Sequence, residues 1–571
     1  MNALDYLVLV GTLLGVAGYG IWRTRGPRDL SGYLKGDGQS RWFVIGLSVM
    51  ATQASATTFL SVPGQGYQDG LGFVQNYFGG PFAMIVIAAV FLPIFRRLKV
   101  FTAYEYLGRR FDLKTRLLGG ALFLTQRGIG AALTIYAPAI VLSSVFGWSL
   151  SLTIICTGLV CVVYTVAGGS DAVRLTQKYQ MGVIFVAMLA AAYLLLAKMP
   201  AGLGLGEVFA LAGGFHKLQA VDFSPNLHTR YTFWSGTLGG FFLALSYFGT
   251  DQSQVQRYLS GASLRESRLG LMFHALCKIP MQFFILLLGV LLFVFYLFQP
   301  SPLLYARQSR DFLAQNVPAE KRQVVEADFS AARAEQGRQL QAWLDARAAG
   351  NVTGATAALA GAQSAQARSE AARQHAAELL QAAHPPTQAN EADYVFITFI
   401  LNYLPHGLIG LLVAAFFAAA LNSKAAELNA LASTTTVDFY RPVLRPEAAQ
   451  AHYVWVSKCF TAFWGMVAIV AAVYAHLVEN IVQAANIVGS LFYGAVLGLF
   501  LLAFFAPRVR GTAAFWGAIA AQIMVLVLYY RLDISYLWYN LIGPVLCVLF
   551  GLVIQAMMGF APTTPAAPAA P

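Results

Sequence analysis

The chain has 571 residues, of which 58% are hydrophobic and only 11% are charged, and its formal net charge is +12. This composition lies far from that of a soluble domain and predicts a membrane protein that crosses the bilayer many times. It argues against a nucleic-acid-binding protein, because the excess of Lys and Arg falls in short loops between apolar stretches and forms no dense basic block.

Apolar stretches of about eighteen residues or more predict roughly thirteen transmembrane helices, so the expected fold class is all-α. In chain order they lie roughly at 4–23, 42–66, 71–97, 114–146, 149–168, 179–199, 231–259, 266–298, 394–432, 453–477, 479–506, 513–531 and 536–558. The first stretch follows Asp5 and precedes Arg23, Arg25 and Arg28. The positive-inside rule therefore predicts an inner-membrane protein with its N-terminus outside and its C-terminus in the cytoplasm.

The second and seventh predicted helices are interrupted. The second meets Pro63, Gly64 and Gly66, and the seventh carries Gly249-Thr-Asp-Gln252 in mid-span, where Asp251 is expected to cap a half-helix. Each interruption leaves backbone carbonyl groups without helical partners. Interrupted helices at corresponding positions, here five helices apart, are typical of secondary transporters built from two inverted five-helix repeats.

Residues 301–393 differ from the rest, since they are rich in Ala, Gln, Glu and Arg. They predict an extracytoplasmic helical hairpin, which breaks between Gly350 and Gly354. The sequence leaves open whether it is a solvated spacer or a lid that captures substrate. The chain then divides into a first transmembrane part (1–300: extra first helix, first repeat and start of the second), the insert, the remaining transmembrane helices (394–560) and a tail expected to be disordered (561–571).

Motifs for catalysis or nucleotide binding are absent from the sequence. The eight histidines have no metal-binding spacing, no glycine-rich loop ends in Lys-Ser/Thr, and the five cysteines form no CxxC pair. We therefore expect a transporter that is not an enzyme and that needs no cofactor beyond a coupling ion.

Three motifs resemble the sodium:solute symporter family, whose members share the LeuT-type fold. They are Tyr164-Thr-Val-Ala-Gly-Gly-Ser-Asp-Ala-Val-Arg-Leu-Thr-Gln-Lys-Tyr-Gln180, Gly249-Thr-Asp-Gln-Ser-Gln-Val-Gln-Arg-Tyr-Leu259, and Gly407-Leu-Ile-Gly-Leu-Leu-Val-Ala followed by Ala418-Ala-Ala-Leu-Asn-Ser423. The resemblance covers most of the chain outside the insert and implies sodium-coupled solute transport.

Sodium prefers oxygen ligands, which carbonyl groups of an unwound helix and nearby hydroxyl or amide groups supply within a membrane. The resemblance implies a sodium site made of the carbonyl oxygens of Ala51, Ala54 and Ala419 and the side chains of Asn422 and Ser423. The family usually has Ser or Thr at the last two positions. Asn422 departs from that pattern, but its amide oxygen is a competent ligand.

Gln177 stands where the family has an aspartate that helps to hold an additional sodium ion, and Lys178 follows it. We therefore expect one sodium ion per transport cycle. A lysine ammonium that replaces sodium altogether stays open as an alternative, favoured by Lys178 and by Lys424 beside Ser423. Lys178 is more simply explained as the end of a cytoplasmic loop whose side chain reaches the interface.

Substrate is expected near the interruptions at the membrane midplane. Gln53, Thr57 and Thr58 lie on the second helix, Tyr77 aligns with a substrate-contacting position, and Tyr247 aligns with an aromatic residue that covers the substrate from the inner side in sugar-transporting relatives.

Arg127 lies about ten residues into an apolar helix, where a guanidinium group is costly unless it meets a partner or a cavity. It either binds a substrate carboxylate or pairs with a buried acid or carbonyl, or the helix starts later and places it near the interface. The first alternative predicts organic anions such as monocarboxylates or sugar acids.

We expect sodium-coupled symport of a small organic solute by alternating access, with the solute, Na⁺ and the lipid bilayer as partners and no obligate protein partner. A proton-coupled or sodium-independent carrier of the same fold, or a solute receptor that does not transport, remains an alternative.

Overall fold

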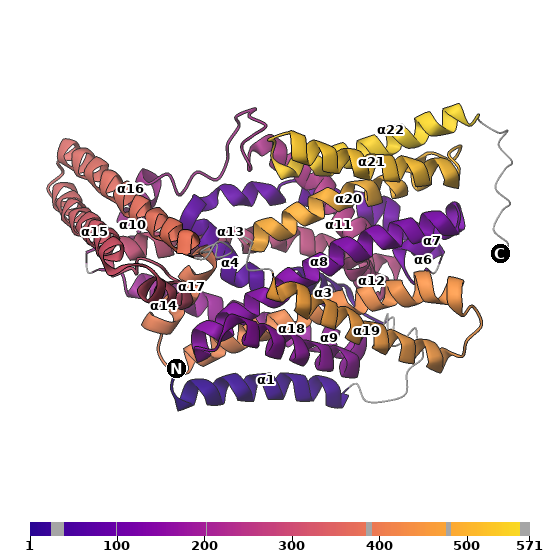
Figure 1. The fold of residues 1–571 in the computed structure, drawn as a ribbon, viewed down its shortest axis with the longest axis horizontal. Helices are drawn as coiled ribbons and strands as arrows, with labels where there is room; N and C mark the ends of the chain where they lie inside the picture. The colour runs from indigo at the N-terminus through magenta and orange to yellow at the C-terminus, as the bar shows by residue number, and fades with distance from the viewer. Residues whose placement is uncertain (24–38, 99, 201, 384–390, 475–480, 560–571) are drawn as a thin grey trace.

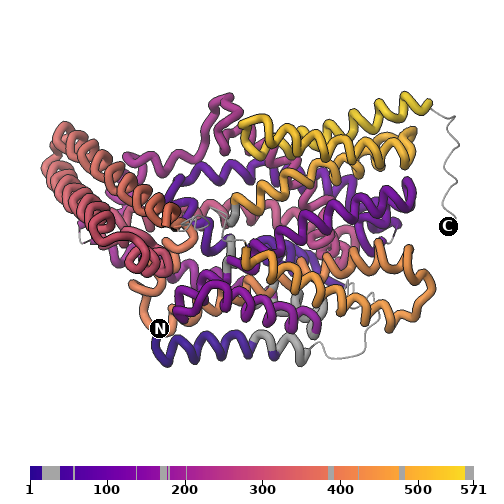
Figure 2. Tube along the Cα trace, in the orientation of Figure 1, coloured from indigo at the N-terminus to yellow at the C-terminus, as the bar shows by residue number. Residues whose placement is uncertain are grey.

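The structure, a computed structural model, describes residues 1–23, 39–98, 100–200, 202–383, 391–474 and 481–559. Within these ranges the regular structure is helical, mostly α with short 3-10 and π segments, and an isolated parallel bridge joins Ser40 and Gly261. Most helices run side by side along the long axis of the molecule, and a helical hairpin projects from one end (Figure 1). The start of α1 lies at the end of the molecule that carries the hairpin, and α22 runs to the opposite end (Figure 2).

Before the insert the helical elements are α1 (Ala3–Arg23), α3 (Trp42–Gln53), α4 (Ala56–Asp69), η1 (Gly70–Tyr77), α5 (Gly80–Val86), η2 (Ile87–Phe91), α6 (Leu92–Arg97), α7 (Ala103–Arg110), α8 (Leu113–Phe146), α9 (Leu150–Ala197), α10 (Leu205–Gly214), η3 (Ser235–Gly239), α11 (Gly240–Thr250), α12 (Gln252–Leu259) and α13 (Leu264–Phe298). The insert contains α14 (Arg307–Asn316), α15 (Ala319–Ala348) and α16 (Val352–Ala383). After it come α17 (Ala392–Tyr403), α18 (Leu408–Thr434), η4 (Thr435–Leu444), α19 (Gln450–Val473), α20 (Ile481–Phe505), α21 (Gly511–Arg531), η6 (Tyr536–Trp538) and α22 (Tyr539–Met557).

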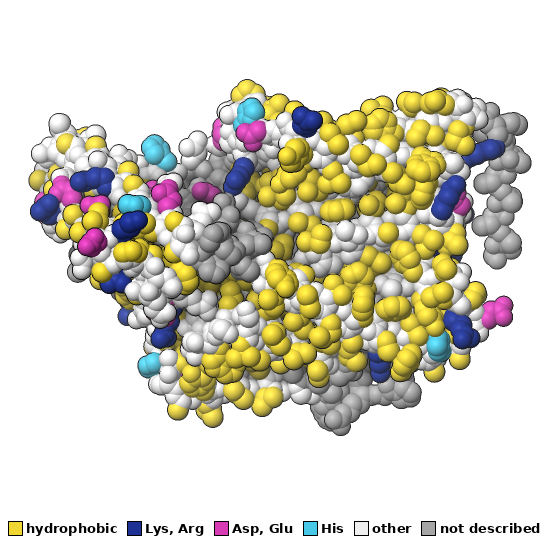
Figure 3. Space-filling view, viewed as in Figure 1, with side chains coloured by type: hydrophobic (Ala, Val, Ile, Leu, Met, Phe, Trp, Pro, Cys, Tyr) yellow, Lys and Arg dark blue, Asp and Glu magenta, His cyan; other side chains and the backbone are white. Residues whose placement is uncertain are grey.

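The expected all-α membrane fold is confirmed. Nine helices of the described ranges are long and apolar enough to cross a membrane, and four shorter apolar helices accompany them. Hydrophobic side chains cover most of the bundle surface in Figure 3, whereas charged side chains gather on the hairpin and along the opposite edge. That distribution matches a bundle whose sides face lipid.

Two predicted helix boundaries are wrong. The helices expected at 149–168 and 179–199 form one helical element, α9, in which Gln180–Ala197 is long and apolar enough to cross a membrane and Leu150–Val166 is a shorter apolar stretch. Conversely, the helix expected at 394–432 is divided into α17 and α18. Pro405 and Gly407 separate them, and Gly407 has a positive φ of 86° that suits glycine.

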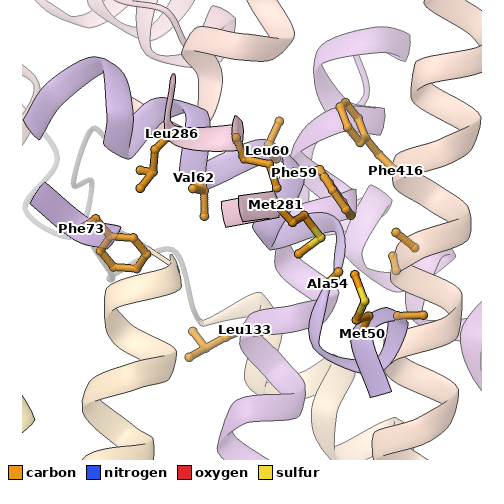
Figure 4. Packing of buried hydrophobic residues seen from close by; sticks show 14 of the residues in the cluster. Met50, Ala54, Phe59, Leu60, Val62, Phe73, Leu133, Met281, Leu286 and Phe416 are labelled. Carbon is orange, nitrogen blue, oxygen red and sulfur yellow. The ribbon is translucent and has the colours of Figure 1, made fainter. Parts of the chain in front are cut away.

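The first interruption lies earlier than the sequence predicts. The chain leaves the helix at Ala54 and Ser55, whereas Pro63 lies inside α4. Figure 4 shows Ala54 at the turn, between Met50 on α3 and Phe59 on α4. Gly64 and Gly66 serve packing instead: a Cβ atom on Gly64 would meet the carbonyl oxygen of Ala392, and one on Gly66 that of Leu286.

The second interruption lies at Asp251, as predicted, between α11 and α12. Asp251 has extended backbone angles and caps α12, because its carboxylate accepts a hydrogen bond from the backbone N–H of Ser253 at 2.9 Å.

The predicted hairpin is present as α15 and α16, which pack along each other and turn at Gly350, where φ is 69°. Arg373 of α16 ties the hairpin to the bundle by donating to the Tyr67 hydroxyl of α4 at 3.2 Å. The predicted tail, 561–571, lies outside the described residues.

Candidate functional site

A cavity of about 180 Å³ lies between the two interrupted helices, and η1, α5, α8, α13, α18 and α20 complete its wall. Six residues singled out in the sequence line it: Gln53, Thr58, Tyr77, Arg127, Tyr247 and Ser423. Of the others, Ala51 and Ala54 lie at the first interruption, and Ala419 is buried on α18, which packs against α3 and α4. The side chains of Thr57, Asn422 and Lys178 lie outside the described residues.

The first interruption leaves two backbone carbonyl groups without their helical hydrogen bonds. In an uninterrupted helix the N–H groups of Ser55 and Thr58 would donate to the carbonyl oxygens of Ala51 and Ala54. Here Ser55 donates to Gln53, and Thr58 donates to Ser55, both at 3.0 Å. The oxygens of Ala51 and Ala54 are therefore released from the helical pattern at the position where the resemblance implies a sodium site.

Ser423 connects this interruption to α18. Its hydroxyl group donates to the carbonyl oxygen of Thr52 at 3.0 Å, and its side chain is buried. A hydroxyl oxygen and released carbonyl oxygens thus lie close together, which is the donor set that a hard monovalent cation prefers.

Gln177 approaches α3 from α9. Its amide oxygen accepts from the Ser48 hydroxyl at 2.6 Å, and its amide nitrogen donates to the Thr52 hydroxyl at 3.4 Å. The side chain is buried and neutral, so it adds no negative charge beside the first interruption.

Arg127 is engaged by acids of the protein itself. Its guanidinium group forms ion pairs with Asp251 and, at 3.2 Å, with Glu427, and it donates to the Tyr493 hydroxyl at 3.2 Å. All four residues are buried. Of the alternatives that the sequence left open, pairing with buried acids is the one present in this structure, where the pairs link α8 to α12, α18 and α20.

Lys424 belongs to the same group of charges. Its ammonium group donates to Oε2 of Glu427 at 2.8 Å and to the carbonyl oxygen of Ala131, and the Thr134 hydroxyl donates to the same carboxylate oxygen at 2.9 Å. Two cations, Arg127 and Lys424, therefore face two anions, Asp251 and Glu427. This buried network is formally neutral.

Lys278 of α13 is a cation outside that network. It lines the cavity, is 5% exposed, and its nitrogen lies 5.2 Å from the ring centroid of Tyr77. Within the described part of the chain it has no ion pair or hydrogen bond. One turn earlier on α13, His274 contacts the amide oxygen of Gln53 at 3.2 Å. The cavity wall therefore has one cation more than the neutral network can balance.

Tyr247 lines the cavity beside Arg127. Its ring is 5.3 Å below the guanidinium carbon of Arg127, and its hydroxyl accepts from Gln254 of α12 at 2.6 Å. This contact joins α11 to α12 across the second interruption.

The sequence analysis missed Glu427, Lys278 and His274. A signal was present for the first two, because each is an ionisable residue in the middle of an apolar stretch, α18 or α13. Such residues face a cavity or a partner inside a membrane bundle. Glu427 was hidden in a stretch of small residues, and no spacing rule marks Lys278.

Comparisons with known proteins agree with this geometry. The model of the sodium:solute symporter family matches residues 33–306 and 372–521, which leaves most of the insert unmatched. The sodium-dependent multivitamin transporter of Oryctolagus cuniculus is 28% identical over 531 residues, which are 92% of this chain and 70% of the relative. Sodium-coupled monocarboxylate transporter 1 of Homo sapiens is 28% identical over 519 residues, 90% of this chain and 71% of the relative.

The sodium/sialic acid symporter of Proteus mirabilis (strain HI4320) is 25% identical over 566 residues, 98% of this chain and 96% of the relative. Among solved structures, the substrate-bound outward-open state of a Na⁺-coupled sialic acid symporter superposes with a TM-score of 0.74. It has 23% identity and covers 98% of this chain and 99% of that chain. The fold is therefore LeuT-like.

Proposed function

The chain belongs to the sodium:solute symporter family, and from this we propose that it carries a small organic anion across the membrane together with one sodium ion, by alternating access. The family model covers most of a multi-pass, LeuT-like bundle and places the protein among sodium-coupled solute symporters. Beyond family membership, we propose the number of sodium ions, the class of substrate and the residues that bind them.

In this proposal sodium binds to the carbonyl oxygens of Ala51, Ala54 and Ala419 and to the side chains of Asn422 and Ser423. The support is the release of the first two carbonyls from helical bonding and the approach of Ser423 to the same turn. Sodium couples to transport by favouring one conformation of α18 against α3 and α4. Each inward charge gains about 2.3 kcal/mol per 100 mV of membrane potential.

A single sodium ion is favoured by the neutral Gln177, which offers an amide where an additional ion would need a carboxylate. The alternative in which a lysine replaces sodium is less favoured for Lys424, because Glu427 already neutralises its ammonium group. The contribution of Lys178 stays a proposal that mutation can test.

Lys278 is the observation that supports an anionic substrate. A buried ammonium group without a counter-ion is costly, and a substrate carboxylate in the cavity would neutralise it. Asp251 and Glu427 already form ion pairs with Arg127. In this proposal Arg127 therefore donates hydrogen bonds to the substrate carboxylate, and the unbalanced positive charge comes from Lys278. Gln53, Thr57, Thr58 and Tyr77 are the proposed polar contacts, and Tyr247 is the proposed inner cover.

We further propose that the hairpin and the N-terminus lie outside and that the C-terminus is cytoplasmic, as the positive-inside rule predicts. The connection of Arg373 to α4 then places the insert against the outer half of the first interrupted helix.

Thermal stabilisation of the purified protein by a panel of monocarboxylates, sugar acids, neutral sugars and amino acids tests the proposal. Carboxylates should raise the melting temperature in NaCl but not in choline chloride. Lys278→Gln should weaken carboxylate binding by about tenfold, whereas Lys114→Gln, at a partly exposed lysine far from the cavity, should not. Equal stabilisation in choline would favour the sodium-independent or proton-coupled alternative, and stabilisation only by neutral solutes would refute the anion.

Binding without transport would instead favour the receptor. Proteoliposomes that are given the stabilising carboxylate on the outside separate these outcomes. Under an inward sodium gradient a symporter accumulates the carboxylate in the lumen, and a receptor does not.

A further inference from the structure

Two apolar cavities lie outside the bundle core, between α8, η4 and α19, and they have volumes of about 290 and 330 Å³. Phe439 of η4 lines both, so they form one groove with this ring as its shared wall. α8 and α19 lie side by side on the face of the molecule seen in Figure 1. The rims are exposed at Ile129 (43%) and Val443 (55%).

The chain builds this groove with glycine and a π-helix. A Cβ atom on Gly120 would lie 2.8 Å from the Phe439 ring, and one on Gly128 would lie 3.0 Å from the Trp464 ring, so both rings settle against bare α8 backbone. The Trp464 indole donates to the Thr435 hydroxyl at 2.9 Å, which fixes the ring. Thr435 begins the π-helical turn η4, a wider helix that is frequent at functional sites.

The length of the groove fits one leaflet of a bilayer. Its wall on α8 runs from Leu117 to Ile129, and its wall on α19 runs from Phe460 to Ala471. At 1.5 Å per residue each wall is roughly 17 Å long. Half of the hydrocarbon core of a bilayer is about 15 Å. One extended acyl chain therefore matches the groove.

Positively charged residues at one end of the groove favour a lipid with an anionic head group. Val443 and Leu444 line the end of the groove near Leu117, and Arg441 and Arg445 flank them in the chain. Arg445 is exposed, and Arg441 lies over the ring of Tyr453 at 5.6 Å.

Among the described residues, neither Arg441 nor Arg445 has an acidic partner. Arg116 is already held by Asp438 at 2.8 Å, and Glu447 is the nearest acid along the chain, exposed beyond Arg445. Two cations thus stand next in the chain to the residues that line this end of the groove, which is where a lipid phosphate would be attracted.

We propose that the groove between α8, η4 and α19 binds an anionic glycerophospholipid, with one acyl chain against Phe439 and Trp464 and the phosphate group against Arg441 and Arg445. This site is separate from the transport cavity. The lipid would lie against the bilayer-facing side of η4, the segment that continues from α18.

Native mass spectrometry tests the site on the full chain, purified in detergent with equimolar palmitoyl-oleoyl phosphatidylglycerol and phosphatidylcholine. The wild type should retain one phospholipid, predominantly phosphatidylglycerol. Filling the groove with Ala121→Phe and Ala471→Leu should lower its retention about tenfold. Arg441→Gln with Arg445→Gln should keep a lipid but lose the preference for phosphatidylglycerol. Val186→Phe, at a 64% exposed position on α9, is the matched control and should retain the lipid as the wild type does.

Unchanged retention in the groove-filled variant, or equal retention of both lipids by the wild type, would overturn the proposal. If the filled variant does not fold, wild-type protein is irradiated with phosphatidylglycerol that carries a diazirine on its acyl chain. Adducts concentrated on peptides of α8, η4 and α19 support the site, and adducts spread equally over α21 and α22 refute it.

Discussion

At the first interrupted helix, the turn between α3 and α4 releases the carbonyl oxygens of Ala51 and Ala54 and has no charged side chain of its own. At the second, between α11 and α12, a carboxylate stands at the turn itself. Asp251 caps α12 through Ser253 and pairs with Arg127. Two interruptions at corresponding places in a repeated fold therefore have opposite electrostatics.

This difference separates two tasks. Released carbonyl dipoles without a fixed charge suit a cation that binds and leaves, because nothing in the protein neutralises them permanently. A capped and ion-paired turn is already satisfied, so it suits a rigid support between helices. We infer that the ion acts at the first interruption and that the second holds α8, α12 and α18 together.

The largest expected effect tests the second interruption. Asp251→Asn keeps an oxygen for the cap but leaves Arg127 with one carboxylate partner, so the free energy of unfolding should fall by about 3 kcal/mol. Unfolding in mixed micelles with increasing sodium dodecyl sulfate measures it. Asp311→Asn removes an exposed partner 3.7 Å from Arg307 and should change stability by less than about 0.5 kcal/mol. Equal effects would contradict a structural role for the buried pair.

A smaller effect tests the first interruption. Ser423→Ala should raise the sodium concentration for half-maximal stabilisation by about tenfold, since it removes one oxygen ligand. Ser433→Ala is the matched control on the same helix, because among the described residues this buried hydroxyl group bonds to its own helix alone, at Ala430. It should shift the midpoint by less than about twofold. Equal shifts for both variants would place the ion elsewhere.

The smallest effect concerns the neighbour of the first interruption. Gln177→Met keeps the size of the side chain and leaves the Ser48 hydroxyl without its acceptor, so stability should fall by about 1 kcal/mol. Because Gln177 is not a proposed ion ligand in this account, the sodium midpoint should move by less than about threefold. Loss of the sodium response would show that the amide holds the ion and would break the proposed contrast.

How far sequence reasoning reached differs between these regions. The break at Asp251 was predicted because Gly249-Thr-Asp-Gln252 places a strong capping residue in an apolar stretch. The break at Ala54 was predicted nine residues late, at Pro63, because proline and glycine are the strongest local signals. In the structure they serve close packing of α4 against α13 and α17 instead.

The partners of Arg127 were beyond local reasoning. Asp251 and Glu427 lie 124 and 300 residues away in the chain, and the packing of α8 and α12 against α18 brings them together. Lys278 shows the same limit, since its excess charge becomes evident only when every other charge around the cavity has been paired.

Direct binding of ²²Na⁺ to the purified wild-type protein and to Ser423→Ala tests the central claim, because it needs no knowledge of the substrate. The account predicts saturable binding of close to one ion per chain in the wild type, with affinity about tenfold weaker in Ser423→Ala and unchanged in Ser433→Ala. Absence of saturable ²²Na⁺ binding to the wild type, with carboxylates still stabilising it in choline chloride, would contradict the account.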